Sequence, residues 1–103
     1  MIFLDFFEVA NLDELRDNKR KLVTLDKNQI VLFYLNGKVY AMNSICPHSS
    51  GDLSQGELDD QEVICPGHQY MFNIKTGVCL NHPGYSLRTY KVKIDGEKVL
   101  VGI

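Results

Sequence analysis

The chain has 103 residues and a formal net charge of −2, with three cysteines and three histidines. Its 45% hydrophobic and 23% charged residues are ordinary for a globular protein, and no apolar run is long enough for a transmembrane helix. This length predicts one domain, residues 1–103. The apolar start lacks the basic segment of an export signal, so we predict a cytoplasmic protein. We also expect a monomer.

Short β-strands dominate the predicted secondary structure. Runs rich in Val, Ile, Leu, Phe and Tyr alternate with turn residues, and Asn36-Gly37 and Asp95-Gly96 have the composition of two-residue hairpin turns. Thr76-Gly77 is a third predicted turn. In chain order, strands are predicted at residues 2–9, 20–25, 29–35, 38–44, 62–64, 70–74, 78–80, 87–95 and 97–102.

One short helical turn is predicted at residues 11–16. Asn11 can cap it, and Glu14 stands three residues on, in a variant of the capping box. The many short strands with glycine-containing turns predict an all-β sandwich or open barrel. Loops outweigh strands in residues 45–85, which are expected to form a subdomain inserted into that fold.

Two short motifs carry the chemistry of the chain, Cys46-Pro47-His48 and Cys65-Pro66-Gly67-His68, with sixteen residues between them. Each is a proline-stiffened turn that could point one thiol and one imidazole the same way. Two thiolates and two imidazoles in matched pairs suit a [2Fe–2S] cluster with two cysteines on one iron and two histidines on the other. A single tetrahedral zinc ion accepts the same ligands, so a structural zinc module is an alternative.

These motifs resemble those of the Rieske iron–sulfur family, and within it the small soluble Rieske-type ferredoxins. Phe72 and Thr76-Gly77 follow the second motif as in family members, and Pro83 stands where their third cluster-covering loop lies. The resemblance implies a Rieske-like antiparallel β-sandwich or open barrel with a cluster-binding subdomain at about 45–85. It also implies one [2Fe–2S] cluster, held by Cys46 and Cys65 on the inner iron and by His48 and His68 on the outer iron.

The resemblance implies an electron carrier and not an enzyme. Such a protein takes single electrons from a flavin-dependent NAD(P)H reductase and passes them to a terminal oxygenase, such as a ring-hydroxylating dioxygenase. The iron site and extra domain of an oxygenase large subunit have no room in 103 residues. A second interpretation is a small Rieske-like subunit of a larger reductase such as nitrite reductase, although those subunits typically lack the cluster ligands.

The reduction potential is expected near the low end of the Rieske range of roughly −150 to +300 mV. High-potential relatives have a disulfide between their cluster loops, and Gly51 and Gly67 stand at the matching positions here. Those relatives also carry Ser and Tyr hydroxyls after the second motif, where this chain has Tyr70 and Phe72. Gln69 stands where relatives usually have a small residue, often glycine.

Acidic residues concentrate in the part of the chain that holds the motifs. From Val39 to Ile74 there are five acids and no Lys or Arg, a charge of −5, and the remainder has eleven basic and eight acidic residues, a charge of +3. We expect this acidic segment to steer a basic docking face on a redox partner, and we expect no nucleic-acid partner. The five acids are Asp52, Glu57, Asp59, Asp60 and Glu62.

Cys79 and His82 belong to neither motif. We expect Cys79 to be a small buried hydrophobic residue and His82 to be a loop residue, and the sequence assigns no further role to either.

Overall fold

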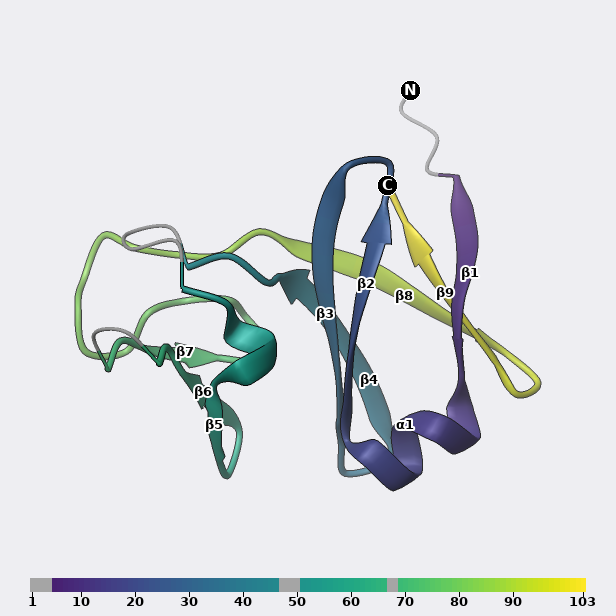
Figure 1. Cartoon of the computed structure of the whole chain (residues 1–103), viewed down its shortest axis with the longest axis horizontal. Helices are drawn as coiled ribbons and strands as arrows, with labels where there is room; N and C mark the ends of the chain where they lie inside the picture. The colour runs from purple at the N-terminus through teal and green to yellow at the C-terminus, as the bar shows by residue number, and fades with distance from the viewer. Residues whose placement is uncertain (1–4, 47–50, 67–68) are drawn as a thin grey trace.

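Two antiparallel sheets, one large and one small, make up the described part of the chain (Figure 1). The structure is a computed structural model that describes residues 5–46, 51–66 and 69–103. The large sheet has the strand order β1-β9-β8-β4-β3-β2, and the small sheet has the order β5-β6-β7. The elements are β1 (Phe6–Asn11), α1 (Leu12–Asn18), β2 (Arg20–Leu25), β3 (Asn28–Leu35), β4 (Lys38–Asn43), the 3-10 turn η1 (Leu53–Gln55), β5 (Glu57–Asp59), β6 (Glu62–Ile64), β7 (Met71–Asn73), β8 (Thr89–Asp95) and β9 (Lys98–Gly102).

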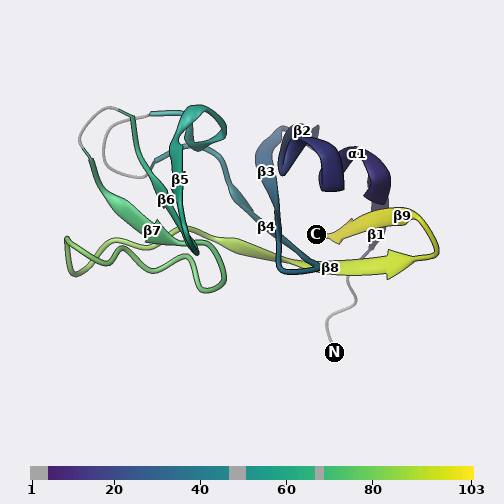
Figure 2. The same ribbon diagram turned by 90° about the horizontal axis from the view of Figure 1, so that it is seen from below.

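The large sheet curls into a nearly closed barrel, and the small sheet lies to one side of it (Figures 1 and 2). The edge strands of the large sheet, β1 and β2, are joined by α1. The N–H of Leu12 donates to the carbonyl of Glu97 at 2.7 Å, and Lys21 Nζ donates to the carbonyl of Val9 at 3.2 Å. These bonds tie the helix to the β8–β9 turn and one edge strand to the other.

The sequence around α1 contains its own start and stop signals. The side chain of Asn11 accepts from the N–H of Asp13 at 2.9 Å, and Glu14 accepts from the N–H of Asn11 at 3.2 Å, which completes the predicted capping box. Lys19 ends the helix in a left-handed conformation, with φ of 70°. Leu15 is fully buried, so the helix is held on the barrel by its apolar side.

β3 is buried on both faces, because its side chains alternate between two hydrophobic clusters. Ile30 and Leu32 point into the barrel, while Val31 and Phe33 point toward the small sheet, and all four are fully buried. The barrel cluster consists of Ala10, Leu15, Val23, Ile30, Leu32, Val39, Ala41, Tyr90, Val99 and Val101. The cysteine cluster consists of Val31, Phe33, Met42, Cys46, Leu53, Val63, Cys65, Phe72, Ile74, Cys79 and Leu87.

The predicted all-β fold and its inserted subdomain at residues 45–85 are confirmed, since the small sheet and its loops lie beside the barrel in both views (Figures 1 and 2). The predicted strand at 78–80 is wrong. Val78 and Cys79 form only isolated bridges, to Ser86 and Phe72. The chain there meets a different partner at each residue, so no ladder develops.

Other differences are small. The strand β5 was not predicted, because two of its three residues are acidic and strand-forming residues are scarce. Residues 2–4 of the first predicted strand lie outside the described residues. The predicted Thr76-Gly77 turn holds Gly77 at φ +78°, where a Cβ would lie 2.3 Å from the Leu87 carbonyl oxygen, so glycine is required there.

Within the described residues, no helix is both long and apolar enough to cross a membrane. The single-domain organisation of the whole chain stays a prediction.

Candidate metal centre

Cys46 lies at the base of the loop that leaves β4. Its N–H donates to the carbonyl of Gly51 at 2.7 Å, and the neighbouring residues Ile45 and Asp52 form an isolated bridge. One step further out, the N–H of Leu53 donates to the carbonyl of Ser44 at 2.6 Å. This short ladder holds the two ends of the loop together and fixes the backbone that carries the Cys46 thiol.

Cys65 lies at the base of a second loop, directly after β6. Its N–H donates to the carbonyl of Tyr70 at 2.8 Å, and its carbonyl accepts from the N–H of Gln69 at 3.1 Å. Gln69 adopts a left-handed conformation, with φ of 62°. Both predicted thiol ligands therefore sit at loop bases that backbone hydrogen bonds close.

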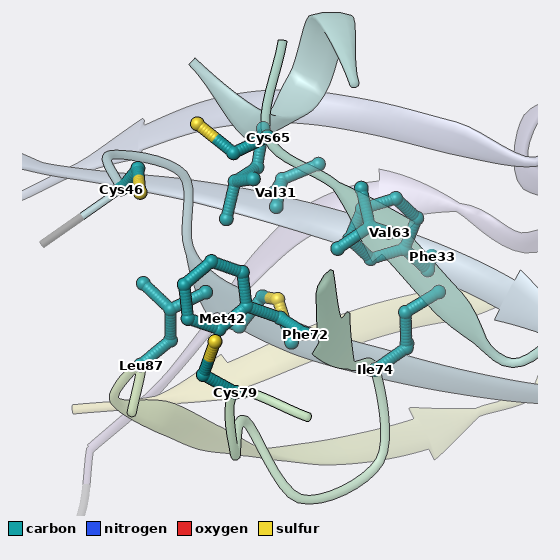
Figure 3. Packing of buried hydrophobic residues seen from close by; sticks show 11 residues of the cluster. Val31, Phe33, Met42, Cys46, Val63, Cys65, Phe72, Ile74, Cys79 and Leu87 are labelled. Carbon is teal, nitrogen blue, oxygen red and sulfur yellow. The ribbon is translucent and has the colours of Figure 1, made fainter. Parts of the chain in front are cut away.

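The two thiols belong to one buried group of side chains. Cys46 is 1% exposed and Cys65 is fully buried, and both lie in the cysteine cluster. Figure 3 shows them at one end of that cluster, with Phe33 and Val63 toward the other end. Sequence positions nineteen apart are brought together by β6 and by the ladder at Ser44 and Leu53.

The donors that the structure describes fit the thiolate half of a metal centre. Soft, buried thiolates suit iron–sulfur clusters and zinc alike. The hydroxyl of Ser44, two residues before Cys46, is buried and has no hydrogen-bond partner among the described groups. Buried hydroxyls normally have a partner, so this one is an exception beside the loop that carries Cys46.

The two predicted histidine ligands, His48 and His68, lie outside the described residues. Within residues 5–46, 51–66 and 69–103, no three His, Cys, Asp or Glu side chains gather closely enough to hold a metal ion. The four-ligand set of Cys46, His48, Cys65 and His68 therefore stays a prediction.

A third loop, residues 80–86, lies against the chain that follows the second motif. The N–H of Leu80 donates to the carbonyl of Met71 at 2.7 Å. The imidazole of His82 stacks on the ring of Tyr70, and burial raises the pKa of the Tyr70 phenol above its ordinary value of 10.0. The prediction of His82 as a loop residue is confirmed, whereas its contact with Tyr70 was not foreseen from the sequence.

The third cysteine is confirmed as a buried side chain. Cys79 is 5% exposed within the cysteine cluster, and its thiol donates to Asn81 Oδ1 at 3.4 Å. Asn81 was missed in the sequence analysis. Its contacts depend on the bridge between Phe72 and Cys79, which no sequence spacing reveals.

The acidic side chains do not surround the cysteines evenly. Asp59 and Glu62 face each other at the turn end of the β5–β6 hairpin, while Glu57 pairs with Ile64, next to Cys65. Since strands rise by roughly 3.3 Å per residue, the turn end lies on the order of 10 Å from Cys65. Four of the five acids therefore form a patch on this hairpin, whereas Asp52 lies opposite Ile45 at the base of the Cys46 loop.

A cavity of about 630 Å³ opens at the barrel, away from both motifs. It is lined by residues of the β2–β3 turn and by Asp5, Phe7, Arg88 and Ile103, and neither Cys46 nor Cys65 lines it.

Comparison with known proteins places these features in a family. The profile of the Rieske-like [2Fe-2S] domain matches residues 5–102. The ferredoxin component of the naphthalene 1,2-dioxygenase system of Pseudomonas putida is 30% identical over 99 residues, which are 95% of each chain.

Solved structures have the same fold. The ferredoxin of carbazole 1,9a-dioxygenase from Nocardioides aromaticivorans IC177 superposes with a TM-score of 0.86 at 28% identity, covering 93% of this chain and 95% of that one. A putative NADH-dependent nitrite reductase small subunit from Mycobacterium tuberculosis superposes with a TM-score of 0.89, covering 99% of this chain and 97% of that one. Its identity of 24% establishes the shared fold alone.

Proposed function

The chain belongs to the Rieske-like [2Fe-2S] domain family, and on this basis we propose that it is a ferredoxin that carries single electrons to a terminal oxygenase. Relatives at 30% identity or more are the ferredoxin components of dioxygenase systems, which carry electrons and are not the catalytic components. The single observation that supports the proposal most directly is the placement of Cys46 and Cys65 in one buried cluster within this family's fold.

We propose that one [2Fe–2S] cluster is held by Cys46, Cys65, His48 and His68. The buried thiolates would bind the inner iron, and the imidazoles, one residue beyond Pro47 and one beyond Gly67, would bind the outer iron. When bound, the cluster supplies a reversible one-electron couple. The protein's part is to keep the thiolates buried and to hold both loop bases closed through the backbone bonds of Cys46 and Cys65.

The proposed electron donor is a flavin-dependent NAD(P)H reductase, and the proposed acceptor is the oxygenase component of the same system. The nitrite reductase alternative is supported by solved structures at 24% and 25% identity, whereas the dioxygenase ferredoxins reach 30% identity along almost the whole chain. Oxygenase ferredoxins are therefore the better-supported comparison. The cytoplasmic location and the monomeric state stay predictions.

Purified protein tests the proposal. The cluster should give a red-brown colour, equal amounts of iron and acid-labile sulfide, and a Rieske-type EPR signal after reduction. Zinc without iron or sulfide would refute the proposal in favour of a structural zinc module.

Two buried cysteines of the same hydrophobic cluster separate ligation from packing. Cys65→Ala should abolish cluster assembly, because a thiolate ligand is lost and metal binding contributes folding free energy. Cys79→Ala removes a thiol of similar burial and should leave assembly intact. A Cys65→Ala protein with full iron content and unchanged thermal stability would contradict the ligand assignment.

A further inference from the structure

The side-chain amide of Asn81 bonds to the backbone on both sides of Tyr70. Its Nδ2 donates to the carbonyl of Gln69 at 3.0 Å, and its Oδ1 accepts from the N–H of Met71 at 3.0 Å. The same oxygen accepts from the thiol of Cys79 at 3.4 Å. A primary amide suits this place because it offers a donor and an acceptor at once, which an aspartate or an aliphatic side chain does not.

Gln69, the residue that Asn81 holds, has an unfavourable backbone. Its φ of 62° lies in the left-handed region, which glycine adopts without cost and a residue with a Cβ adopts only at a cost. This conformation turns the following chain so that the carbonyl of Tyr70 accepts from the Cys65 N–H at 2.8 Å, and with the bond from Gln69 N–H to the Cys65 carbonyl it closes the base of the second motif's loop. A residue held in such a conformation needs support from its surroundings.

Two neighbouring contacts also hold residues 69–71, which we call the strap, but they do not involve Gln69. The bond from Leu80 N–H ends on the Met71 carbonyl, and the ring of His82 covers the side chain of Tyr70. Asn81 is the residue whose side chain donates to the Gln69 carbonyl. It thus acts on the peptide unit that follows the strained φ.

We infer that Asn81 is a positioning residue for the metal centre: its amide keeps Gln69 in the left-handed conformation on which the closed base of the second ligand loop depends. This inference rests on the proposed function, because Gln69 directly follows the proposed ligand His68 in the sequence. The backbone of Gln69 fixes the direction in which the chain leaves that residue. Asn81 therefore stabilises at position 69 a left-handed backbone conformation that a glycine would adopt without such support.

The test compares Asn81→Ala in the native chain and in a Gln69→Gly background. In the native chain, Asn81→Ala should broaden the EPR lines of the reduced cluster and should release iron to a chelator roughly threefold to tenfold faster, as expected for the loss of hydrogen bonds to buried backbone. In the Gln69→Gly background the effect on both readouts should be smaller, since glycine adopts the left-handed region without support.

Asn73→Ala is the matched control. Asn73 Oδ1 accepts from the N–H groups of Lys75 and Thr76, at 2.8 and 3.1 Å, at the other end of β7. Its loss should lower the melting temperature without broadening the EPR lines. If Asn81→Ala does not fold, Asn81→Asp replaces it, because aspartate keeps the acceptor and removes the donor to Gln69.

The outcomes separate this inference from the proposed function. Native protein without a Rieske-type signal would overturn both. A native signal together with an Asn81 variant that behaves as Asn73→Ala does, or that loses iron equally fast in both backgrounds, would overturn the role of Asn81 alone.

Discussion

The imidazole of His82 lies nearly parallel to the ring of Tyr70, with the ring centroids 3.7 Å apart and the planes inclined by 12°. Tyr85 meets the same ring edge-on, at 5.5 Å and 66°. Three rings from two segments of the chain thus interlock beside the strap that follows the second motif. The edge-on pair of Tyr70 and Tyr85 has the geometry of aromatic pairs that contribute beyond the area they bury, and the His82 imidazole covers the face of the Tyr70 ring.

His82→Ala should lower the free energy of unfolding by about 1 kcal/mol, because the stack on Tyr70 is lost. Chemical denaturation followed by circular dichroism measures this change. His82→Phe keeps a flat ring in place and should recover most of the loss. Equal destabilisation by both substitutions would mean that the stack contributes nothing specific.

His68→Cys should lower the reduction potential if a cluster still assembles, because a thiolate in place of a neutral imidazole adds one negative charge at the outer iron. All-cysteine clusters lie near −400 mV, so a decrease on the order of 100 mV or more is expected. Protein-film voltammetry measures it. His82→Cys introduces a thiol in the neighbouring loop and should leave the potential in place. An unchanged potential in a cluster-loaded His68→Cys protein would argue against His68 as a ligand.

Phe72→Tyr should raise the potential, since it supplies a hydroxyl at the position where high-potential relatives have one. Phe72 is fully buried in the cysteine cluster. One added hydrogen bond to sulfur corresponds to roughly 20–60 mV for a one-electron couple. Phe33→Tyr, toward the opposite end of that cluster, is the control for burying a hydroxyl (Figure 3). Equal shifts in both variants would show that the potential responds to polarity in general.

Neutralising Asp59 and Glu62 should separate stability from partner docking. The two residues are directly opposite each other in the β5–β6 hairpin, and like charges so placed are destabilising. Asp59→Asn with Glu62→Gln should therefore keep or raise the melting temperature. At low salt the double variant should accept electrons from the reductase roughly threefold to tenfold more slowly, because long-range attraction is weakened.

Stopped-flow reduction at low and high salt measures the docking effect, which screening should remove at high salt. Asp17→Asn on α1 is the control for a change of net charge elsewhere. A rate that does not respond to the hairpin charges at any salt concentration would exclude steering by this patch.

Glu14→Gln should destabilise the protein at neutral pH and progressively less in acid. The bond from Lys21 Nζ at 2.7 Å, followed by that from the Asn11 N–H, lowers the pKa of Glu14 below its ordinary value of 4.5. A lowered folded-state pKa contributes stability above pH 4.5 that is lost as the pH falls through the folded value. The carboxylate is exposed, so the effect on melting temperature should be small.

Melting curves of native and Glu14→Gln protein across this pH range test the prediction, and acid loss of metal is common to both. Lys21→Met removes the main cause of the shift and should make the native profile resemble that of Glu14→Gln. A difference that stays constant down to acid pH would rule out the charge of Glu14 as its source.

Local signals in the sequence were sufficient for most of the fold. The Asn11 capping box and the Asn36-Gly37 turn depend on residues a few positions apart, and both form as predicted. The continuous apolar run of β3 predicted a strand but not its place between two clusters, which depends on distant partners. The strand assigned to 78–80 failed for the same reason, because its pairing is decided by Phe72 and Ser86.

The site was predictable to the extent that its residues are contiguous. The motifs around Cys46 and Cys65 identified both buried thiols, since proline-stiffened turns with paired ligand types are rare in sequence. Asn81 and the contact of His82 with Tyr70 were not predictable. They result from a loop ten or more residues away that folds back on the strap, and asparagine or histidine in a loop carries no distinctive signal.

The position of β3 has a consequence for how damage spreads. This strand contributes side chains to both hydrophobic clusters, with the barrel cluster on one of its faces and the cysteine cluster on the other. Loss of packing in either cluster would remove contacts from β3, on which the other cluster also packs. A substitution that disrupts the packing around Cys46 and Cys65 would therefore also lower the stability of the barrel.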